Sequence, residues 1–311
     1  MEALTIANAQ AVTSTTIGEA VYFQFLDFLD VSPKTRRTYT YNLKPFFQYL
    51  AREGVTRPTR ETILAYRAEL SETMKPATVH AYLAVVRCLF SWLEDAGLYP
   101  NVAKKVKSPK IEKGYKKDYL TAEQLREIVT PLERETEGGA RDYAMVCLMA
   151  CCGLRTVEVT RANIEDLKPL GGFTVLYVQG KGQDEKTEFV KVPNVVEKAI
   201  RAYLAKRGET NGKAPLFASA SNNNKGGRLT TVAVSSVAKK AMTSAGFSSE
   251  RLTAHSLRHS AITNALLAGN SLQDAQQLAR HASITTTMIY NHAIDRLKNH
   301  CADDVASAIF A

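Results

Sequence analysis

Residues 254–292 read AHSLRHSAITNALLAGNSLQDAQQLARHASITTTMIYNH, and this stretch decides the character of the chain. Its apolar residues recur with helical spacing, so we expect helices throughout it. His255 lies three residues before Arg258, which puts both side chains on one face of a helix. Tyr290 follows His281 by nine residues. The stretch therefore predicts helices that carry two pairs of polar residues at fixed spacing.

Four more helices are predicted at the other end of the chain. The apolar spacing of IGEAVYFQFLDFL is close to 3.6 residues. The second helix begins with Ser32 as N-cap and Pro33 at the first helical position. The third follows Thr59, and the fourth follows Pro76 with one continuous apolar stripe. Residues 17–100 are therefore predicted to form a compact four-helix domain.

A basic linker and a larger domain complete the chain. Residues 101–118 contain seven lysines and two acidic residues, and proline and glycine interrupt any helix there. The segments FTVLYVQG and TEFVKVP are predicted as two strands of a hairpin. The fold class is therefore mainly α. It comprises an all-α domain at 17–100, the linker at 101–118, and a mostly α domain at 119–311 with a small antiparallel β-sheet.

Composition excludes several classes of protein. The 311 residues are 45% hydrophobic and 23% charged, as in soluble globular proteins. No apolar run approaches the roughly 20 residues that span a bilayer, and the N-terminus lacks the pattern of a secretory signal. Five cysteines show no CxxC or Cys/His metal spacing. We expect a cytoplasmic protein with reduced cysteines, no metal site and no membrane partner.

The net charge of +9 is concentrated in the linker. The first 100 residues carry ten basic and ten acidic side chains, whereas residues 101–118 have a net charge of +5. A lysine-dense segment between nearly balanced domains can follow a phosphate backbone. A solvated linker explains the same pattern equally well.

Five short stretches of the second domain carry polar groups suited to phosphoryl transfer. They are Arg155 in CGLRTVEV, Lys181 in VQGKGQ, His255 with Arg258 in AHSLRH, His281 in ARHASI, and Tyr290 in TTTMIYNH. Guanidinium groups stay charged and match phosphate geometry, and a tyrosine hydroxyl can form a phosphoester. Taken singly, each residue is equally explained as a surface ion pair, a solvated turn or a core side chain.

In this order the residues resemble the catalytic signature of the tyrosine recombinase (phage integrase) family. That signature is Arg…Lys…His-x-x-Arg…His/Trp…Tyr, with the last two nine residues apart. The first four helices resemble the family's SAM-like core-binding domain, so the resemblance spans about residues 17–300. It implies a site-specific recombinase that forms a 3′-phosphotyrosine intermediate and a Holliday junction.

The resemblance also implies a role for each residue. Tyr290 is the nucleophile, and Arg155 and Arg258 bind the phosphate. Lys181 is the general acid for the leaving 5′-oxygen, with Lys186 in the same turn as the second candidate. His255 binds the phosphate and accepts the proton of the tyrosine.

Two further residues have supporting roles in this assignment. His281 holds a non-bridging oxygen or positions the tyrosine, and Glu158 orients an arginine or caps its helix. The HxxxH spacing of His255 and His259 lacks the other ligands of a zinc site. No carboxylate cluster suggests Mg²⁺ and no GxxxxGK[ST] loop suggests ATP, so no cofactor is expected.

The family resemblance predicts partners. These are double-stranded DNA with inverted-repeat core sites, three further copies of this chain in a homotetramer, and an accessory recombinase or directionality factor. The candidates for DNA contact are Lys34, Arg36, Arg37, Lys75, Thr78, His80, Arg87, Lys104, Lys105, Lys107 and Lys110, each equally explained as solvated surface. The amphipathic tail at 300–311 is expected to dock on a neighbouring protomer.

Two alternatives stay open from the residues alone. A type IB topoisomerase shares the tyrosine chemistry, and a DNA-binding regulator could retain a vestigial site. The short segment before the first helix leaves no room for an arm-binding domain, which suggests the two-domain Xer-like or transposon kind, in a bacterial, phage or mobile-element context and associated with the nucleoid. Ala279 and Arg280 precede His281, where Leu-Gly is usual in the family.

Overall fold

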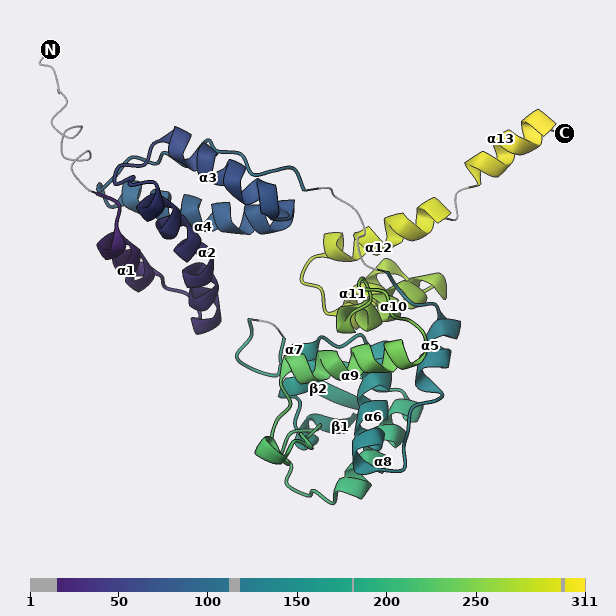
Figure 1. Ribbon diagram of the computed structural model, residues 1–311. Coiled ribbons are helices and arrows are strands. Elements are labelled where there is room, and N and C mark those ends of the chain that lie inside the picture. The colour runs from purple at the N-terminus through teal and green to yellow at the C-terminus, as the bar shows by residue number, and fades with distance from the viewer. Residues whose placement is uncertain (1–15, 112–117, 181, 298–299, 311) are drawn as a thin grey trace, which may run out of the picture. The chain divides into compact units, whose positions relative to one another are not determined.

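The computed structural model describes residues 16–111, 118–180, 182–297 and 300–310 (Figure 1). The chain divides into two compact units, Met1–Lys113 and Gly114–Ala311. The division falls within the stretch predicted as a linker. The fold is mainly α with one small antiparallel sheet, as the sequence predicts.

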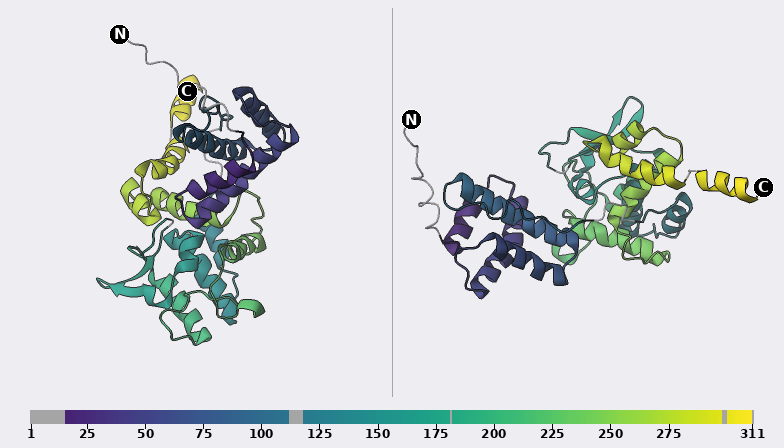
Figure 2. Two further views of the ribbon diagram at one scale, coloured as in Figure 1. Left: turned by 90° about the vertical axis from the view of Figure 1, so that its left-hand side faces the viewer. Right: turned by 90° about the horizontal axis from the view of Figure 1, so that it is seen from above.

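Unit 1 is a bundle of four helices that pack together in every view (Figure 1 and Figure 2). They are α1 (Glu19–Phe28), α2 (Pro33–Arg52), α3 (Arg60–Thr73) and α4 (Pro76–Asp95). Ser32 caps α2 as predicted, because its hydroxyl accepts a hydrogen bond from the main-chain nitrogen of Thr35 at 3.3 Å. Helix α2 continues through Pro45 without interruption.

The predicted apolar stripe of α4 lies in the core of unit 1. Its members Val79, Leu83, Val86, Phe90 and Leu93 are all buried. Among the described residues, α4 is the one helix long and apolar enough to cross a membrane, and its buried stripe accounts for that composition. The helix is therefore a core element of the bundle.

The start of the predicted linker packs on unit 1. The guanidinium of Arg87 donates to the carbonyl of Val106 at 3.0 Å and to the Ser108 hydroxyl at 3.1 Å. Arg67 donates to the carbonyl of Lys107 at 3.0 Å, and the side chains of Ala103 and Val106 are buried. Residues 101–108 thus differ from the expected open linker, because their apolar side chains complete the bundle core.

Unit 2 holds nine helices among the residues that the structure describes, with two short 3₁₀ turns and three strands. The helices are α5 (Ala122–Val129), α6 (Glu137–Cys152), α7 (Thr156–Arg161), α8 (Asn194–Arg207), α9 (Thr231–Ser244), α10 (Ala254–Leu267), α11 (Leu272–Ala279), α12 (Ile284–Leu297) and α13 (Cys301–Phe310). The strands are β1 (Leu167–Leu170), β2 (Phe173–Val178) and β3 (Glu188–Lys191), antiparallel in the order β1-β2-β3. Strand β1 was not predicted, because Pro169 and a short polar stretch hide its period.

Helix α6 organises the core of unit 2. Met145 and Leu148 are fully buried, and the helix packs against α8 and α10. It ends at Gly153, whose φ of 60° is the left-handed conformation that glycine adopts most easily. The chain then turns directly into Arg155 at the start of α7.

A smaller apolar cluster joins α10, α11 and α12, which lie together at one end of unit 2 (Figure 1). Its members are Ile262, Leu266, Ala275, Ala279 and Tyr290. Packing of these three helices brings the two polar pairs of residues 254–292 to the end of α6.

Candidate active site

Arg155 is fixed by the turn that precedes α7. Its main-chain nitrogen donates to Oε2 of Glu158 at 2.8 Å, and its guanidinium nitrogen Nη1 donates to Oε1 at 2.6 Å. Nη2 donates to the carbonyl of Arg280 at 3.3 Å. The side chain of Arg155 is 23% exposed, so it is held from behind and open on one side.

Arg258 is buried on α10 beside Arg155. It donates to the carbonyl of Gly153 at 2.6 Å and to the carbonyl of Ala279. Burial, followed by the positive charges of Arg155 and Arg280, lowers the pKa of Arg258 to about 9. The guanidinium is still charged at neutral pH, and an arriving phosphate would relieve the repulsion among the arginines.

Glu158 is the buried counter-charge of this cluster. Its side chain is 0% exposed, and Arg280 donates to its Oε2 at 2.7 Å. Burial works to raise the pKa of Glu158, but the charges and hydrogen bonds of Arg280 and Arg155 hold that pKa below its ordinary value. One ionised carboxylate therefore serves two arginines and also caps α7.

His281 follows Arg280 and lies beside the arginines. Its Nδ1 is hydrogen-bonded to the buried hydroxyl of Thr287 at 2.9 Å. Burial, then the charges of Arg258, Arg155 and Arg280, lowers the pKa of His281 to about 4. The imidazole is consequently neutral at pH 7, with one ring nitrogen donating and the other accepting.

Tyr290 is 6% exposed on α12. Burial raises the pKa of its hydroxyl to about 12, against the opposing charges of Arg258 and Arg155. The hydroxyl is hydrogen-bonded to Nδ1 of His259, and the two ring centroids are 5.3 Å apart. The ring of Tyr290 also stacks near that of His281, at 6.3 Å between centroids.

The role expected for His255 stays a prediction, and a second histidine of α10 lies close to Tyr290. The side chain that contacts the hydroxyl of Tyr290 is His259, one turn further along α10. His255 is exposed, and its ring lies edge-on to that of His259 at 6.2 Å. It borders an open hollow of about 810 Å³ whose lining includes Thr156 and Lys239. His255 thus lies at the edge of this hollow.

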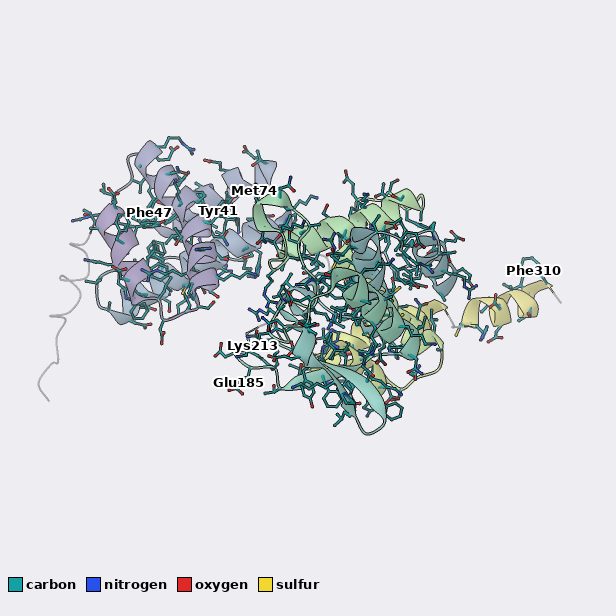
Figure 3. The ribbon with its side chains drawn as sticks, turned by 90° about the horizontal axis from the view of Figure 1, so that it is seen from below. Tyr41, Phe47, Met74, Glu185, Lys213 and Phe310 are labelled. Atoms are coloured by element: carbon teal, nitrogen blue, oxygen red, sulfur yellow. The ribbon has the colours of Figure 1, made fainter. Side chains whose placement is uncertain are left out.

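Lys181 lies outside the described residues. The preceding residue, Gly180, accepts a hydrogen bond from Arg161 of α7 at 3.1 Å, which ties the β2–β3 turn to the arginine-bearing end of unit 2. Lys186, the second candidate, forms an ion pair with the buried carboxylate of Asp166. Glu185 projects outward from this turn (Figure 3). The pairing of Lys186 with Asp166 favours Lys181 as the lysine of the turn.

The candidates for DNA contact fall into three groups. Lys34, Arg37, Lys75, Thr78, His80, Lys105, Lys107 and Lys110 are exposed. Arg36 pairs with Asp27 at 2.6 Å, and Lys104 lies 3.6 Å from Glu94. Arg87 is half-buried, and its guanidinium donates to the carbonyl of Val106 and to the hydroxyl of Ser108.

Sequence reasoning missed three members of the site. His259 was considered only as a zinc ligand, Thr287 was not singled out, and Arg280 was noted only as a departure from the usual Leu-Gly. The one available signal was that departure, a basic residue within an otherwise small and apolar helix end.

Comparison with known proteins identifies the family. Residues 118–296 match the phage integrase family, and residues 22–97 match the phage integrase N-terminal SAM-like domain. The tyrosine recombinase XerC of Pelobacter propionicus is 31% identical over 278 residues, which cover 86% of this chain and 88% of XerC.

Two solved structures show the same fold. The XerH site-specific recombinase, in a post-cleavage complex with a palindromic difH substrate, has a TM-score of 0.76 at 19% identity and covers 96% of this chain and 92% of its own. A lambda integrase tetramer bound to a Holliday junction has a TM-score of 0.68 at 17% identity and covers 93% and 81%. Since the family match covers more than half of its length, the chain belongs to the phage integrase family and is a tyrosine site-specific recombinase.

Proposed function

We propose that this recombinase cuts and rejoins DNA through a covalent bond between the Tyr290 oxygen and a 3′-phosphate. The observation that carries the proposal is the meeting of Arg155, Arg258 and His281 around the buried hydroxyl of Tyr290. Arg258 and Arg155 both oppose the rise in the pKa of that hydroxyl, which is the effect of cations close to a developing phenolate.

The reaction is a phosphoryl transfer in two balanced steps. The Tyr290 oxygen attacks phosphorus and loses its proton, while the bond from phosphorus to the 5′-oxygen breaks. Lys181 gives a proton to that leaving oxygen, by the family resemblance. In the second step the 5′-hydroxyl of a partner strand attacks the phosphotyrosine and releases Tyr290. The phosphotyrosine conserves the energy of the phosphodiester.

The cations act on the charge of the transition state. Each terminal nitrogen of an arginine carries two hydrogens, so Arg155 can keep its bond to Glu158 and still donate to a non-bridging oxygen. A neutral His281 that accepts from Thr287 at Nδ1 presents Nε2–H to the same phosphate. Fixed donors of this kind are each worth on the order of a hundredfold or more in rate.

His259 is the group in contact with the tyrosine proton. The hydrogen bond between its Nδ1 and the Tyr290 hydroxyl supports transfer of the proton to His259 during attack. His255, which is exposed on the same helix, is then assigned to bind the phosphate. This assignment divides between two histidines the roles that the resemblance gave to one.

Assembly as a homotetramer on two inverted-repeat DNA sites completes the proposal. The lambda integrase structure, a tetramer on a Holliday junction, supports this assembly by its shared fold. Helix α13 exposes Val305, Ile309 and Phe310, by 58%, 67% and 86% (Figure 3). Such an apolar surface on a short helix is suited to docking on a neighbouring protomer.

Deletion of residues 300–311 tests the role of the tail. The rate of recombination between two sites is expected to fall more than the affinity for one site, because recombination needs contact between protomers and binding to one site does not. An unchanged recombination rate in the truncated protein would remove the tail from the proposal.

The setting and the DNA contacts follow from the same proposal. We place the protein in the cytoplasm, on DNA of a bacterial, phage or mobile-element genome, with an accessory recombinase or directionality factor as a further partner. The exposed basic residues of unit 1 and of residues 101–110 are assigned to phosphate contact.

The chemistry is tested with wild-type protein and the Tyr290→Phe variant. Each is incubated, in EDTA and without ATP, with supercoiled plasmid that carries the DNA flanking the gene. The expected result is plasmid relaxation and an SDS-resistant protein–DNA adduct with the wild type and neither with the variant. Tight binding to this DNA without any adduct would contradict the proposal and favour a regulator.

A further inference from the structure

The residue before His281 is a buried arginine in a left-handed backbone conformation. Arg280 ends α11 with a φ of 50°, and among the described residues it is the one non-glycine residue with a positive φ. Its side chain is 3% exposed. A left-handed conformation is unfavourable for a residue with a side chain, and a buried charge requires compensation. Both costs fall on a single residue next to the catalytic arginines.

We propose that Arg280 is a positioning residue that holds Arg155 in the orientation required to bind the scissile phosphate. The proposal rests on the role given to Arg155 under the proposed function. Arg280 itself does not need to touch the DNA, because its guanidinium is directed to Glu158 and to main-chain carbonyls.

The side chain of Arg280 fixes the carboxylate that holds Arg155. Its Nη2 donates to Oε2 of Glu158 at 2.7 Å, while Arg155 donates to Oε1 at 2.6 Å. Oε2 also accepts from the main-chain nitrogen of Arg155. The two oxygens thus pair with different guanidinium groups, and rotation of the carboxylate would break at least one of these ion pairs. The bond from Arg280 thus restricts the position of the Arg155 guanidinium.

The backbone of Arg280 provides a second link to Arg155. Its carbonyl oxygen accepts from Nη2 of Arg155 at 3.3 Å. The left-handed conformation at Arg280 sets the direction of that carbonyl and of the side chain together. Arg155 is consequently held at both terminal nitrogens, one through Glu158 and one directly.

Arg280 also ties together the three segments that form the site. Its Nη1 donates to the carbonyl of Leu278 at 2.7 Å, and its Nη2 donates to that of Gly153 at 3.2 Å. The carbonyl of Gly153 accepts from Arg258 as well, at 2.6 Å. The end of α6, the start of α7 and the residue before His281 are thereby connected through one guanidinium.

The charge balance gives Arg280 a second effect on the same site. Among the described residues of this cluster, Arg155 and Arg280 form ion pairs with the carboxylate of Glu158, and the positive charge of Arg258 lies near it. With Arg280 bound to Glu158, that carboxylate cannot neutralise Arg155 fully. The cluster retains positive charge for a phosphate.

The test measures single-turnover adduct formation on plasmid carrying the DNA that flanks the gene, at saturating protein. Arg280→Met keeps an unbranched side-chain stem without the charge, and Arg280→Lys keeps the charge without the planar guanidinium. Arg201→Met, at an exposed arginine that pairs with Glu197 on α8, is the matched control. Circular dichroism and Tm show whether each variant folds.

Arg280→Met is expected to form adduct about a hundredfold more slowly, the effect of a misplaced catalytic group. Its Kd for the same DNA should stay within about twofold of wild type, since losing a group that only positions others changes rate rather than binding. Arg280→Lys should recover part of the rate. If Arg280→Met does not fold, the folded Arg280→Lys variant must still show a slower rate at unchanged Kd.

A double-variant cycle with Glu158→Gln decides whether Arg280 acts through Glu158. On the Glu158→Gln background, Arg280→Met should add less than about threefold, because residues in one network are not additive. If the two substitutions slow adduct formation independently, so that their effects multiply, the proposal is overturned. It is also overturned if Arg280→Met forms adduct at the wild-type rate, or if that variant loses only DNA affinity. Failure of the proposed function is separate: the wild type itself would form no adduct, or Tyr290→Phe would still form one.

Discussion

The hydroxyl of Tyr290 is hydrogen-bonded to Nδ1 of His259, four residues after His255 on the same helix. Residues four apart lie on one face of a helix, so the two histidines lie on the same face of α10, and the ring of His259 lies against the tyrosine. The ring of His281 stacks near the ring of Tyr290, with 6.3 Å between the two centroids. The ring of Tyr290 therefore contacts one histidine from α10 and one from the turn between α11 and α12.

Replacement of His259 by phenylalanine should slow DNA cleavage by about a hundredfold, the lower range for losing a proton acceptor. The aromatic ring is kept, so DNA affinity and Tm should change little. The measurement is the rate of adduct formation at several pH values. His255→Phe is the comparison: a loss of rate there, with His259→Phe unaffected, would return proton acceptance to His255.

Protein stability should fall as the pH is lowered from 7 to 5, with His281 contributing. Its folded pKa of about 4 lies below the ordinary value of 6.5, so the unfolded chain binds a proton in this range and the folded protein does not. The stabilisation is fully present above pH 6.5 and is lost as the pH falls toward 4. The urea midpoint of His281→Gln should depend less on pH; an equal dependence would contradict a neutral, buried His281.

Glu158→Gln should lower the free energy of unfolding by about 3–5 kcal/mol, since it leaves buried arginine charge without its partner. The matched control is Glu197→Gln, which removes an ion pair with Arg201, whose side chain is 62% exposed. Exposed pairs contribute about 0–1 kcal/mol. Urea unfolding at pH 7 compares the two variants, and equal losses would show that Glu158 is not a buried counter-charge.

Lys105 and Arg87 should contribute differently to the salt dependence of DNA binding. Lys105 is exposed, so Lys105→Ala should reduce the slope of log K against log salt by about 0.9 for a lost phosphate contact. Arg87→Met should leave that slope unchanged and lower the stability of unit 1 by about 1–2 kcal/mol, through its bonds to residues 106 and 108. Fluorescence anisotropy at several salt concentrations tests both, and a reduced slope in Arg87→Met would restore it as a DNA contact.

The sequence by itself determined the local structure and the chemical groups. Ser32 before Pro33 predicts the start of α2, and Pro76 predicts the start of α4. The stripe of α4 predicts the core of unit 1. These signals are readable because they depend on interactions within one or two helical turns.

Only the tertiary structure decided which of these groups meet. Tyr290 is hydrogen-bonded to His259, which is 31 positions away in the sequence, and Arg280 is hydrogen-bonded to Glu158, which is 122 positions away. Neither pairing leaves a periodic pattern in the sequence, because each depends on how α10, α11 and α12 pack against the end of α6. The hydrogen-bond partner of Tyr290 and the position of Arg155 beside Glu158 and Arg280 are therefore set by helix packing, which local spacing does not encode.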